Sequence, residues 1–297
     1  MPTLTLKSPA KLNLVLDILH KRADGFHEVE FIMQELELHD TITIETTSHS
    51  NKIQLECTDP KVPLNASNTC WKAVELMYQE AQLQKKPLEG VRVFMEKHIP
   101  SAGGLGGGSS NAAAVLKGLK ELWSLKLSGE KLAELGGKIG SDVPFFIYGG
   151  TCIATGRGEI ITPLKEKCPQ LHLAFIVPPV KVPESKTKWI YGNFRVENVK
   201  EHPSIKEMQA LLQSKNNSPQ SVAEKMGNAF ETLTLKEYEP VFELIAKLNS
   251  MQPGIYKTML AGAGPTVVVV CENEKVASQV IAPFRMQGWV AFATHTI

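Results

Sequence analysis

A glycine-rich run between Pro100 and Ala114 constrains the fold of this 297-residue chain more than any other stretch. Five of the six residues from Gly103 to Gly108 are glycine, and a segment rich in alanine, leucine and lysine follows directly. Glycine lets the backbone turn sharply and leaves no side chain between its N–H groups and an anion. The first turn of a following helix adds unpaired N–H groups and the positive end of the helix dipole. The pattern predicts a site for a phosphorylated ligand, with a nucleotide as the leading candidate.

Two well-known phosphate loops do not fit this run. Gly103 and Gly108 have the spacing of a P-loop, but Ser109 stands where that motif needs its lysine. A dinucleotide-binding loop follows the first strand and needs its third glycine where Ser109 stands. A flexible glycine linker is the structural alternative. Leu105 within the run and the helical segment beyond it make that interpretation the weaker one.

The composition is that of an ordinary soluble enzyme. Apolar residues make up 43% of the chain, and 32 basic residues nearly balance 31 acidic ones, which gives no electrostatic reason to expect a nucleic-acid or membrane partner. No apolar run approaches the roughly 18 residues of a membrane-spanning helix, and the first residues show no signal pattern. Five scattered cysteines without C-x-x-C spacing favour a reducing compartment and argue against a zinc site. We expect a cytoplasmic protein, either a monomer or a weak homodimer.

The pattern of apolar residues predicts strands and helices arranged in two lobes. In the first part, a turn at 23–25 joins two segments into a long hairpin, followed by a separate strand at 40–46. Helices are expected there over 66–84, 110–123 and 128–136. Several prolines mark a boundary near residue 165. Beyond it we expect strands at 171–177, 255–260, 265–271 and 288–294, and helices at 204–213, 236–249 and 274–285. The fold class is therefore α+β, with lobes at 1–165 and 166–297.

Three polar residues in apolar surroundings are candidates for catalysis. Lys11 and Asn13 lie on one side of an apolar strand, where they could instead form the solvated face of an edge strand. Asp142 stands among glycine, serine, valine and proline, and it could be a positioned base or merely a turn or helix-cap residue. Periodicity alone leaves both alternatives open and favours the solvated strand for Lys11.

Two turns could contact a ligand. Phe26 and His27 follow the hairpin turn, where a histidine on the surface is the plain alternative. A second glycine turn lies near the end of the chain, at 260–267, between two expected strands. It is a tight hairpin turn in any case, and its glycines would also allow close approach to a ligand.

The order of these motifs resembles the GHMP kinase superfamily of galactokinase, homoserine kinase, mevalonate kinase and phosphomevalonate kinase. The run P-x-x-x-G-L-G-G-G-S-S-N-A-A from Pro100 is similar to its phosphate-binding motif. One branch, which phosphorylates 4-diphosphocytidyl-2-C-methyl-D-erythritol, also resembles the chain at S-P-A-K-L-N-L, R-A-D-G-F-H, G-S-D-V-P-F-F and L-x-G-x-G-P-T. The resemblance spans nearly the whole chain. It implies a ribosomal-protein-S5-like N-terminal lobe, a ferredoxin-like C-terminal lobe and an active site between them.

The resemblance implies two catalytic residues. Asp142 would take the proton from the substrate hydroxyl, and Lys11 beside it would stabilise charge. An ordinary carboxylate, with a pKa of about 3.9, is a weak base for an alcohol. Phosphoryl transfer is loose, however, so positioning and charge neutralisation dominate the catalysis. The resemblance thus supplies a reason for a lysine within an apolar strand.

The resemblance also implies an acceptor site for a small molecule that carries a cytidine diphosphate group. Asn13 matches a substrate contact, and His27 would hydrogen-bond the cytosine edge. Phe26 would stack on the base, where relatives often carry tyrosine. Tyr191 is the candidate for a second aromatic residue against the base. The neighbouring segment 182–187 departs from the V-S-T pattern that is usual in the family.

On the donor side the resemblance implies ATP, with its phosphates on the glycine-rich loop. The assigned residues are Pro100, Ser101, Ala102, Gly103, Gly104, Leu105, Gly106, Gly107, Gly108, Ser109 and Ser110, with Asn68 and Lys97 near the adenine and ribose. Mg²⁺ is expected with ATP, but no acidic pair in the sequence indicates its ligands. The implied reaction belongs to non-mevalonate isoprenoid synthesis. A GHMP kinase of the homoserine or mevalonate type, or a non-catalytic nucleotide sensor on this fold, is the alternative.

Overall fold

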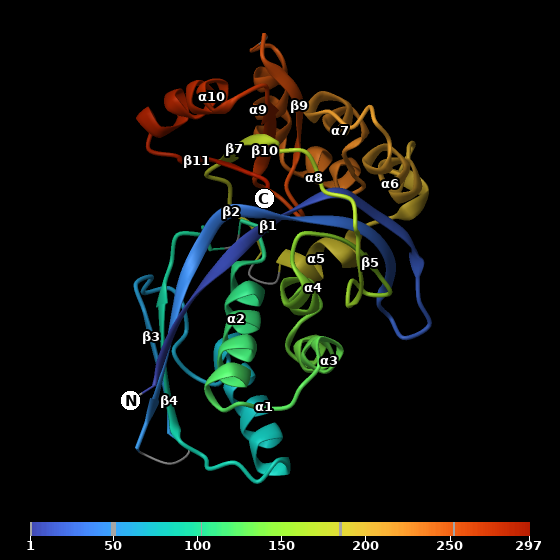
Figure 1. Ribbon diagram of the computed structural model, residues 1–297. Helices are drawn as coiled ribbons and strands as arrows, with labels where there is room; N and C mark the ends of the chain where they lie inside the picture. Colours follow the sequence, from blue (N-terminus) through green and yellow to red (C-terminus); the bar gives the residue numbers. More distant parts are fainter. Residues whose placement is uncertain (1, 49–51, 102, 184–185, 252) are drawn as a thin grey trace.

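The computed structural model describes residues 2–48, 52–101, 103–183, 186–251 and 253–297. These residues form one sheet of seven strands and another of four. In Figure 1 the larger sheet and helices α1 to α4 make the lower half, and the smaller sheet with α6 to α10 makes the upper half. The long hairpin of β1 and β2 crosses the molecule where the halves meet (Figure 1). The two-lobed α+β class predicted from the sequence is confirmed.

The hairpin consists of β1 (Thr3–Lys21) and β2 (His27–Thr47), strands of 19 and 21 residues. The sequence predicted shorter, interrupted strands, but β2 absorbs the separate strand expected at 40–46. Continuity is possible because register shifts absorb the irregularities, one of them between Pro9 and Lys11. Such a bulge re-aims the side chains beside it. Here it brings β1 to the glycine-rich loop, where the N–H of Lys11 donates to the carbonyl of Leu105 at 2.9 Å.

The first sheet has the strand order β3-β4-β2-β1-β8, and β5 pairs with β2 and β6. The remaining strands from the first half of the chain are β3 (Ile53–Cys57), β4 (Gly90–Glu96), β5 (Thr151–Thr155) and β6 (Ile160–Pro163). The helices that pack beside the sheet are α1 (Thr69–Leu83), α2 (Gly107–Leu122), α3 (Gly129–Ile139) and α4 (Val143–Tyr148). The side chains of Asn68 and Ser128 cap α1 and α3.

Helix α2 begins earlier than the sequence predicted. The expected start was Ser110, but Gly107 is already helical. The reason is Gly106, which takes the left-handed conformation at the helix start (φ 75°) and accepts the N–H of Ser110 at 2.9 Å. The last glycines of the run therefore form the first turn of the helix rather than a loop in front of it.

The second sheet has the order β11-β7-β10-β9 and is antiparallel throughout. Its strands are β7 (His172–Val177), β9 (Ile255–Leu260), β10 (Val267–Cys271) and β11 (Val290–His295). The helices are α5 (Lys186–Asn193), η1 (Val196–Asn198), α6 (Ile205–Gln213), α7 (Pro219–Lys225), α8 (Glu231–Glu237), α9 (Glu239–Asn249) and α10 (Glu274–Met286). The helix expected over 236–249 is confirmed from Glu239 onward, but its expected start is wrong. The chain breaks between α8 and α9 because Tyr238 leaves helical geometry and Pro240 fits only a first helical turn.

The hairpin belongs structurally to both halves. Strand β8 (Gly227–Asn228) comes from the second half but pairs in parallel with β1, and Leu36 of β2 bridges to Thr296. One buried cluster joins Leu12 and Leu36 of the hairpin to Phe175 of β7, together with further apolar residues of both halves. This shared core fixes the position of one half on the other.

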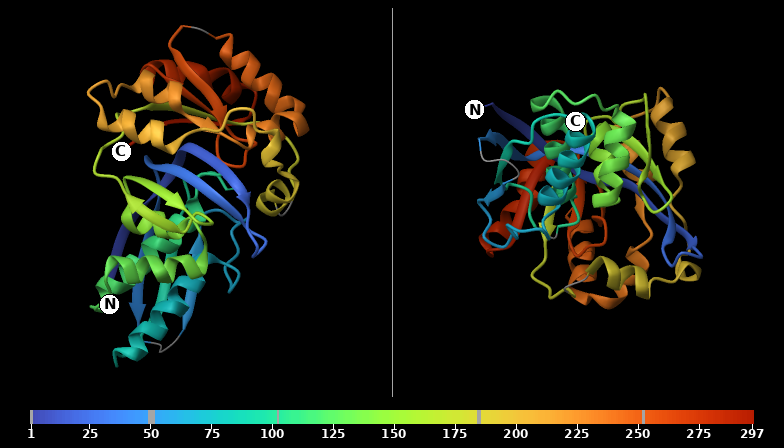
Figure 2. Two further views of the ribbon diagram at one scale, coloured as in Figure 1. Left: turned by 90° about the vertical axis from the view of Figure 1, so that its right-hand side faces the viewer. Right: turned by 90° about the horizontal axis from the view of Figure 1, so that it is seen from below.

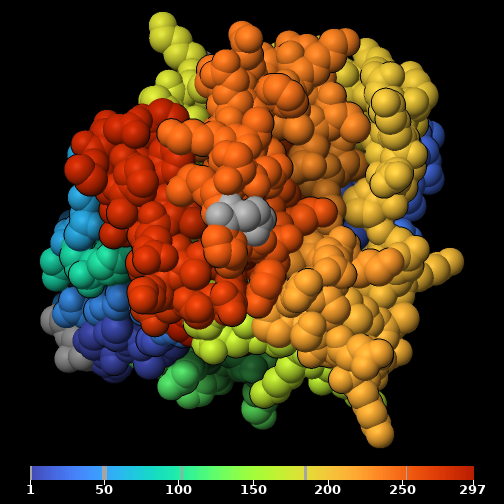
Figure 3. Space-filling view, turned by 90° about the horizontal axis from the view of Figure 1, so that it is seen from above, coloured from blue at the N-terminus to red at the C-terminus, as the bar shows by residue number. Residues whose placement is uncertain are grey.

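Two further views show how the halves divide the surface. In Figure 2 the red and orange second half sits on one end of the blue and green first half. From above, the second half covers nearly the whole face, and the first half emerges at the rim (Figure 3). We propose a division between lobes near residue 165, since β6 ends at Pro163 in one sheet and β7 begins at His172 in the other.

Candidate active site

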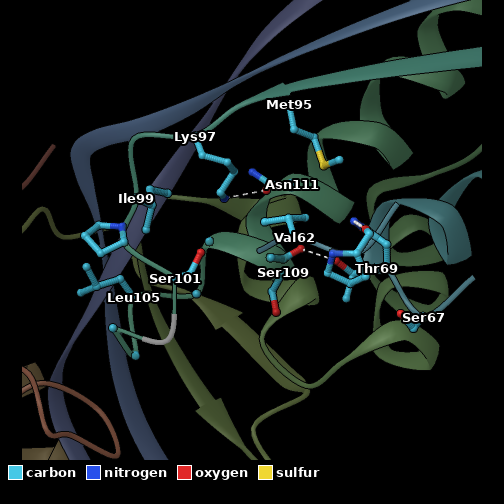
Figure 4. A pocket seen from close by; sticks show the side chains of 18 residues that line it. Val62, Ser67, Thr69, Met95, Lys97, Ile99, Ser101, Leu105, Ser109 and Asn111 are labelled. Carbon is cyan, nitrogen blue, oxygen red and sulfur yellow. Dashed lines mark hydrogen bonds between the residues drawn. The ribbon is translucent and has the colours of Figure 1, made fainter. Parts of the chain in front are cut away.

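A cavity of about 420 Å³ opens over the glycine-rich loop. Its lining comes from the segment before α1, the end of β4 and the loop itself: Val62, Pro63, Ser67, Asn68, Thr69, Met95, Lys97, Ile99, Pro100, Ser101, Gly103 to Ser109 and Asn111. Figure 4 shows the apolar side chains of Val62 and Met95 on its wall, with the amine of Lys97 turned towards Asn111. We call this the donor cavity.

Two glycines of the loop are required by the backbone. Gly104 and Gly106 both have positive φ, at 77° and 75°. A Cβ on Gly106 would lie 2.8 Å from the Phe146 ring, and one on Gly104 would lie 3.0 Å from the carbonyl oxygen of Ala261. Substituted residues would therefore be strained by conformation and blocked by neighbours. Gly104, Gly106, Gly107 and Gly108 line the donor cavity without side chains, at the start of α2, where the first N–H groups of a helix have no partner within the helix.

Lys97 is held at the donor cavity by a buried polar network. Its amine donates to a carboxylate oxygen of Asp40 and, at 2.9 Å, to Asn111 Oδ1. Asp40 is completely buried, and its other oxygen accepts the N–H groups of His98 and Ile99 at 2.7 and 2.8 Å. The sequence placed Lys97 near the adenine and ribose but missed Asp40, because a single aspartate at the centre of a strand carries no signal of its own.

The other residues assigned to ATP binding differ in whether their side chains line the donor cavity or make contacts within the protein. Asn68 caps α1 through a 2.8 Å bond to the N–H of Cys70, and Thr69 donates to the carbonyl of Gly108 at 2.7 Å. Ser109 lines the cavity, whereas Ser110 is 1% exposed and accepts a bond from Ser8 at 2.7 Å. The hydroxyl of Ser110 therefore supports the loop from behind. Ala102 lies outside the described residues.

Lys11 and Asp142 come together although they are far apart in the sequence. The Lys11 amine lies 3.5 Å from Asp142 Oδ2 and donates to Asn13 Oδ1 at 3.0 Å. Lys11 is only 5% exposed, so the solvated edge-strand alternative is wrong. Asp142 precedes α4 but makes no capping bond with its side chain, which leaves its carboxylate free of the helix-cap role. A buried cation thus faces a partly exposed carboxylate.

A second cavity, of about 600 Å³, adjoins Asp142. We call it the acceptor cavity. It is lined by the hairpin turn, the start of α4, the β5–β6 turn and α5: Lys21, Gly25, Phe26, His27, Phe31, Ser141, Asp142, Arg157, Thr187, Lys188, Tyr191 and Gly192. The structure brings Phe26, His27 and Tyr191 to this cavity, and it places Asn13 outside the lining, beside Lys11.

Aromatic and basic side chains share the walls of the acceptor cavity. The rings of His27 and Tyr191 have centroids 5.4 Å apart, and the Arg157 guanidinium lies 4.9 Å from the exposed Phe26 ring. Lys21, Arg157 and Lys188 were missed by the sequence reasoning, since isolated basic residues in separate segments look like ordinary surface charge. Together they make this cavity suitable for an anionic ligand with an aromatic group.

Burial favours the neutral form of His27. Burial, followed by the nearby charges of Lys21 and Arg195, lowers the pKa of His27 from its ordinary value. A neutral imidazole has one donor and one acceptor nitrogen. Tyr191 is more deeply buried, and that burial together with Asp142 raises the pKa of its phenol. Both rings therefore offer hydrogen bonds without charge.

The structure also bears on metal binding, membrane spanning and the state of the cysteines. Among the described residues, no three histidine, cysteine, aspartate or glutamate side chains form a group that could hold a metal ion. In the same part of the chain, every helix is too short or too polar to cross a membrane. All five cysteines are free thiols, in line with their scattered spacing.

The fold and the phosphate loop define a small-molecule kinase of the GHMP type. The family model for the GHMP kinases N terminal domain matches residues 68–150, and the one for the GHMP kinases C terminal matches residues 200–287. The chain belongs to the GHMP kinases, and the resemblance inferred from its motifs is confirmed. A mevalonate kinase of Methanococcus jannaschii shares the fold, with a TM-score of 0.68 at 15% identity over 100% of this chain and 99% of that one.

The most informative relatives are kinases of one kind. A 4-diphosphocytidyl-2-C-methyl-D-erythritol kinase of Geobacillus thermodenitrificans is 38% identical over 91% of this chain and 89% of its own length. The enzyme of that name from Acetivibrio thermocellus is 36% identical over 100% of both chains. A crystal structure of 4-(cytidine 5'-diphospho)-2C-methyl-D-erythritol kinase has a TM-score of 0.79 at 26% identity, covering 99% of each chain.

Proposed function

We propose that this protein transfers the γ-phosphate of ATP to the 2-hydroxyl of 4-diphosphocytidyl-2-C-methyl-D-erythritol, giving the 2-phosphate and ADP, in non-mevalonate isoprenoid synthesis. The observation that carries the proposal is the position of the Lys11–Asp142 pair. Asp142 lines the acceptor cavity, while the backbone of Lys11 is bonded to the donor loop at Leu105. The names of the full-length relatives supply the particular acceptor.

On the donor side, ATP fits the chemistry of the loop. The N–H groups at the start of α2 face a cavity that glycines keep open, and Lys97 is fixed beside Gly107 by Asp40. Phosphate oxygens are the natural ligands of such N–H groups. Mg²⁺ would accompany ATP, with phosphates and water supplying most of its ligands, as is usual for this ion.

Catalysis rests on positioning and charge. As the 2-hydroxyl oxygen bonds to the γ-phosphorus, its proton passes to Asp142, and the bond from that phosphorus to the bridging oxygen breaks to leave ADP. Lys11, buried between the carboxylate and the donor loop, orients Asp142 and offsets the negative charge that gathers there. The transition state is loose, so the carboxylate need accept the proton only late in the transfer.

The acceptor cavity accounts for a cytidine diphosphate group. Phe26 and Tyr191 offer ring faces for the cytosine, and neutral His27 offers a donor and an acceptor to its edge. Lys21, Arg157 and Lys188 supply positive charge for the diphosphate. Asn13 lies outside the cavity lining and holds the Lys11 amine by accepting a hydrogen bond from it.

The decisive experiment is mass spectrometry of the product. The purified protein is incubated with ATP, Mg²⁺ and 4-diphosphocytidyl-2-C-methyl-D-erythritol, and we expect the acceptor to gain the mass of one phosphate. Homoserine and mevalonate are offered in parallel as competing acceptors. Turnover of either one, with none of the cytidyl compound, would assign another GHMP kinase activity. ATP binding without turnover of any acceptor would indicate a nucleotide sensor.

The proposal also covers the location, oligomeric state and partners of the protein. We propose a cytoplasmic monomer or weak homodimer with no nucleic-acid or membrane partner, supported by free cysteines and by a formal net charge of +1. Sedimentation velocity across a range of concentrations measures the oligomeric state. A tight dimer at submicromolar concentration would contradict it.

A further inference from the structure

Lys186, at the start of α5, is a partly buried cation that the mechanism above does not use. Its amine donates a hydrogen bond to the carbonyl of Gly264, in the glycine turn between β9 and β10. This lysine therefore reaches from one segment of the second half into the turn formed by another. The turn was singled out in the sequence, but neither cavity described above includes it among its lining residues.

The turn itself lies directly against the donor loop. A Cβ added to Gly262 would be 3.2 Å from the carbonyl oxygen of Gly104, and one added to Gly104 would be 3.0 Å from that of Ala261. Backbone thus touches backbone across the boundary between the halves. Asn228 holds the turn by donating to the carbonyls of Leu260 and Gly262 at 2.9 and 2.7 Å. Lys186 is consequently anchored to a turn that touches the glycine-rich loop.

Lys186 also lies within electrostatic range of Lys11. Burial, and secondarily the charge of Lys11, lowers the pKa of Lys186 to about 8. Lys11 on β1 is one charged group that faces it, and Lys11 in turn faces the Asp142 carboxylate. Two amines that repel each other beside an anion-binding loop are stabilised when an anion lies between them. Ala261 and Ala263 of the turn bring no hydroxyl or charge of their own to this place.

We propose that Lys186 is a second catalytic cation, whose amine binds the γ-phosphate of ATP from the side opposite Lys11 and stays bound to the phosphoryl group during transfer. This inference rests on the proposed kinase function and adds to it a residue contributed by the second half. Negative charge spreads over the equatorial oxygens of the transferred group in the transition state. A fixed cation there stabilises the transition state more than the ground state and remains protonated throughout.

Four variants separate charge from hydrogen bonding. Lys186→Met removes both, Lys186→Gln keeps a donor for the Gly264 carbonyl without charge, and Lys186→Arg keeps both. Lys181→Met removes an exposed lysine a few residues upstream and is the matched control. We expect the Lys186→Met and Lys186→Gln variants to lower kcat by about 100-fold and the Lys186→Arg variant to keep most of the kcat of the unaltered protein. The control should match the unaltered protein. Full activity of the Gln variant would overturn the proposal, because the lysine would then serve only to hold the turn.

Nucleotide binding gives a readout that does not need the acceptor. Calorimetric titration with ATP and with ADP measures the affinity for each nucleotide. We expect Lys186→Met to lower the affinity for ATP about tenfold and to leave the affinity for ADP nearly unchanged, since ADP lacks the contacted phosphate. Equal weakening of both nucleotides would contradict a γ-phosphate contact. This titration stays valid if the cytidyl compound is not turned over, so failure of the proposed function and failure of this inference give different results.

The pH profile provides a third measurement. Below pH 8 the Lys186 amine carries its proton, so kcat/KM for ATP should fall as the pH rises through about 8. The Lys186→Arg variant should lack this fall, because a guanidinium keeps its charge in that range. An unchanged alkaline limb in the Arg variant would assign the titration to another group and count against the proposal.

Discussion

The donor cavity and the acceptor cavity are built from different parts of the chain. The donor cavity takes its shape mainly from one stretch of the chain before and at the start of α2, Ile99 to Ser101 and Gly103 to Ser109. The acceptor cavity gathers side chains from the hairpin turn, the start of α4, the β5–β6 turn and α5. The donor cavity is therefore built largely from one stretch of backbone. The acceptor cavity is built from aromatic and basic side chains that the fold brings together from separate segments.

This difference sets what each cavity can recognise. Backbone N–H groups bind any phosphate, so the donor cavity suits the part of the reaction that all GHMP kinases share. Rings and charged side chains on separate elements can be exchanged one at a time, so the acceptor cavity suits the part that differs between them. Substitutions should accordingly change one affinity without the other.

The largest effect is expected at the point where the two cavities meet. Asp142→Asn removes the proposed proton acceptor, and we expect kcat to fall by about 1,000-fold. ATP affinity should stay within a few-fold, since Asp142 lines only the acceptor side. Steady-state kinetics and calorimetry measure the two quantities. Glu243→Gln, at an exposed position of α9, is the control; a kcat for Asp142→Asn equal to this control would rule out the assigned base.

The donor cavity can be tested by adding one methyl group. Gly106→Ala places a Cβ 2.8 Å from the Phe146 ring at a φ of 75°, which should cost about 1–3 kcal/mol in strain. We expect a lower melting temperature and at least a tenfold rise in KM for ATP. Gly129→Ala adds the same methyl group in the first turn of α3, where no heavy atom lies within 4 Å, and should leave both unchanged. Equal behaviour of the two variants would show that the loop tolerates side chains.

The acceptor cavity can be tested with the exposed ring. Phe26→Ala removes a stacking surface that is worth about 1–3 kcal/mol for a nucleobase. The KM for the cytidyl substrate should rise about tenfold or more, with KM for ATP unchanged. Phe26→Tyr keeps the ring and should behave like the unaltered protein. A rise in KM for ATP instead would mean that the two cavities are not independent.

The smallest effect concerns pH. The pKa of His27 is lowered below its ordinary 6.5, so the imidazole is neutral at pH 7 and becomes protonated only as the pH falls through a value below 6.5. A charged imidazole loses its acceptor nitrogen and is repelled by Lys21 and Arg195. KM for the cytidyl substrate should therefore rise on acidification, and KM for ATP should not follow it. His27→Gln should flatten this profile, and an unaltered acid limb in that variant would contradict the role of His27.

The comparison also explains what the sequence could predict. The glycine run and the four strands expected in the second half follow from local patterns, and the structure contains them. Lys11 and Asp142 could be paired only through the resemblance to a family, because they lie 131 positions apart in the sequence and nothing local indicates contact. Asp40, Arg157 and Lys186 carry no local signal at all, since their neighbours come from distant segments and tertiary packing alone gives them a role.

The shared hairpin has a consequence for how this protein loses its structure. Leu12 and Leu36 lie in one buried cluster with Phe175, and β8 pairs with β1, so each half completes its packing with residues of the other. A polypeptide ending at residue 165 would expose this apolar face to water, which costs about 25 cal/mol for every Å² uncovered. Heating should therefore melt the whole chain in one cooperative transition, and limited proteolysis should release no stable half.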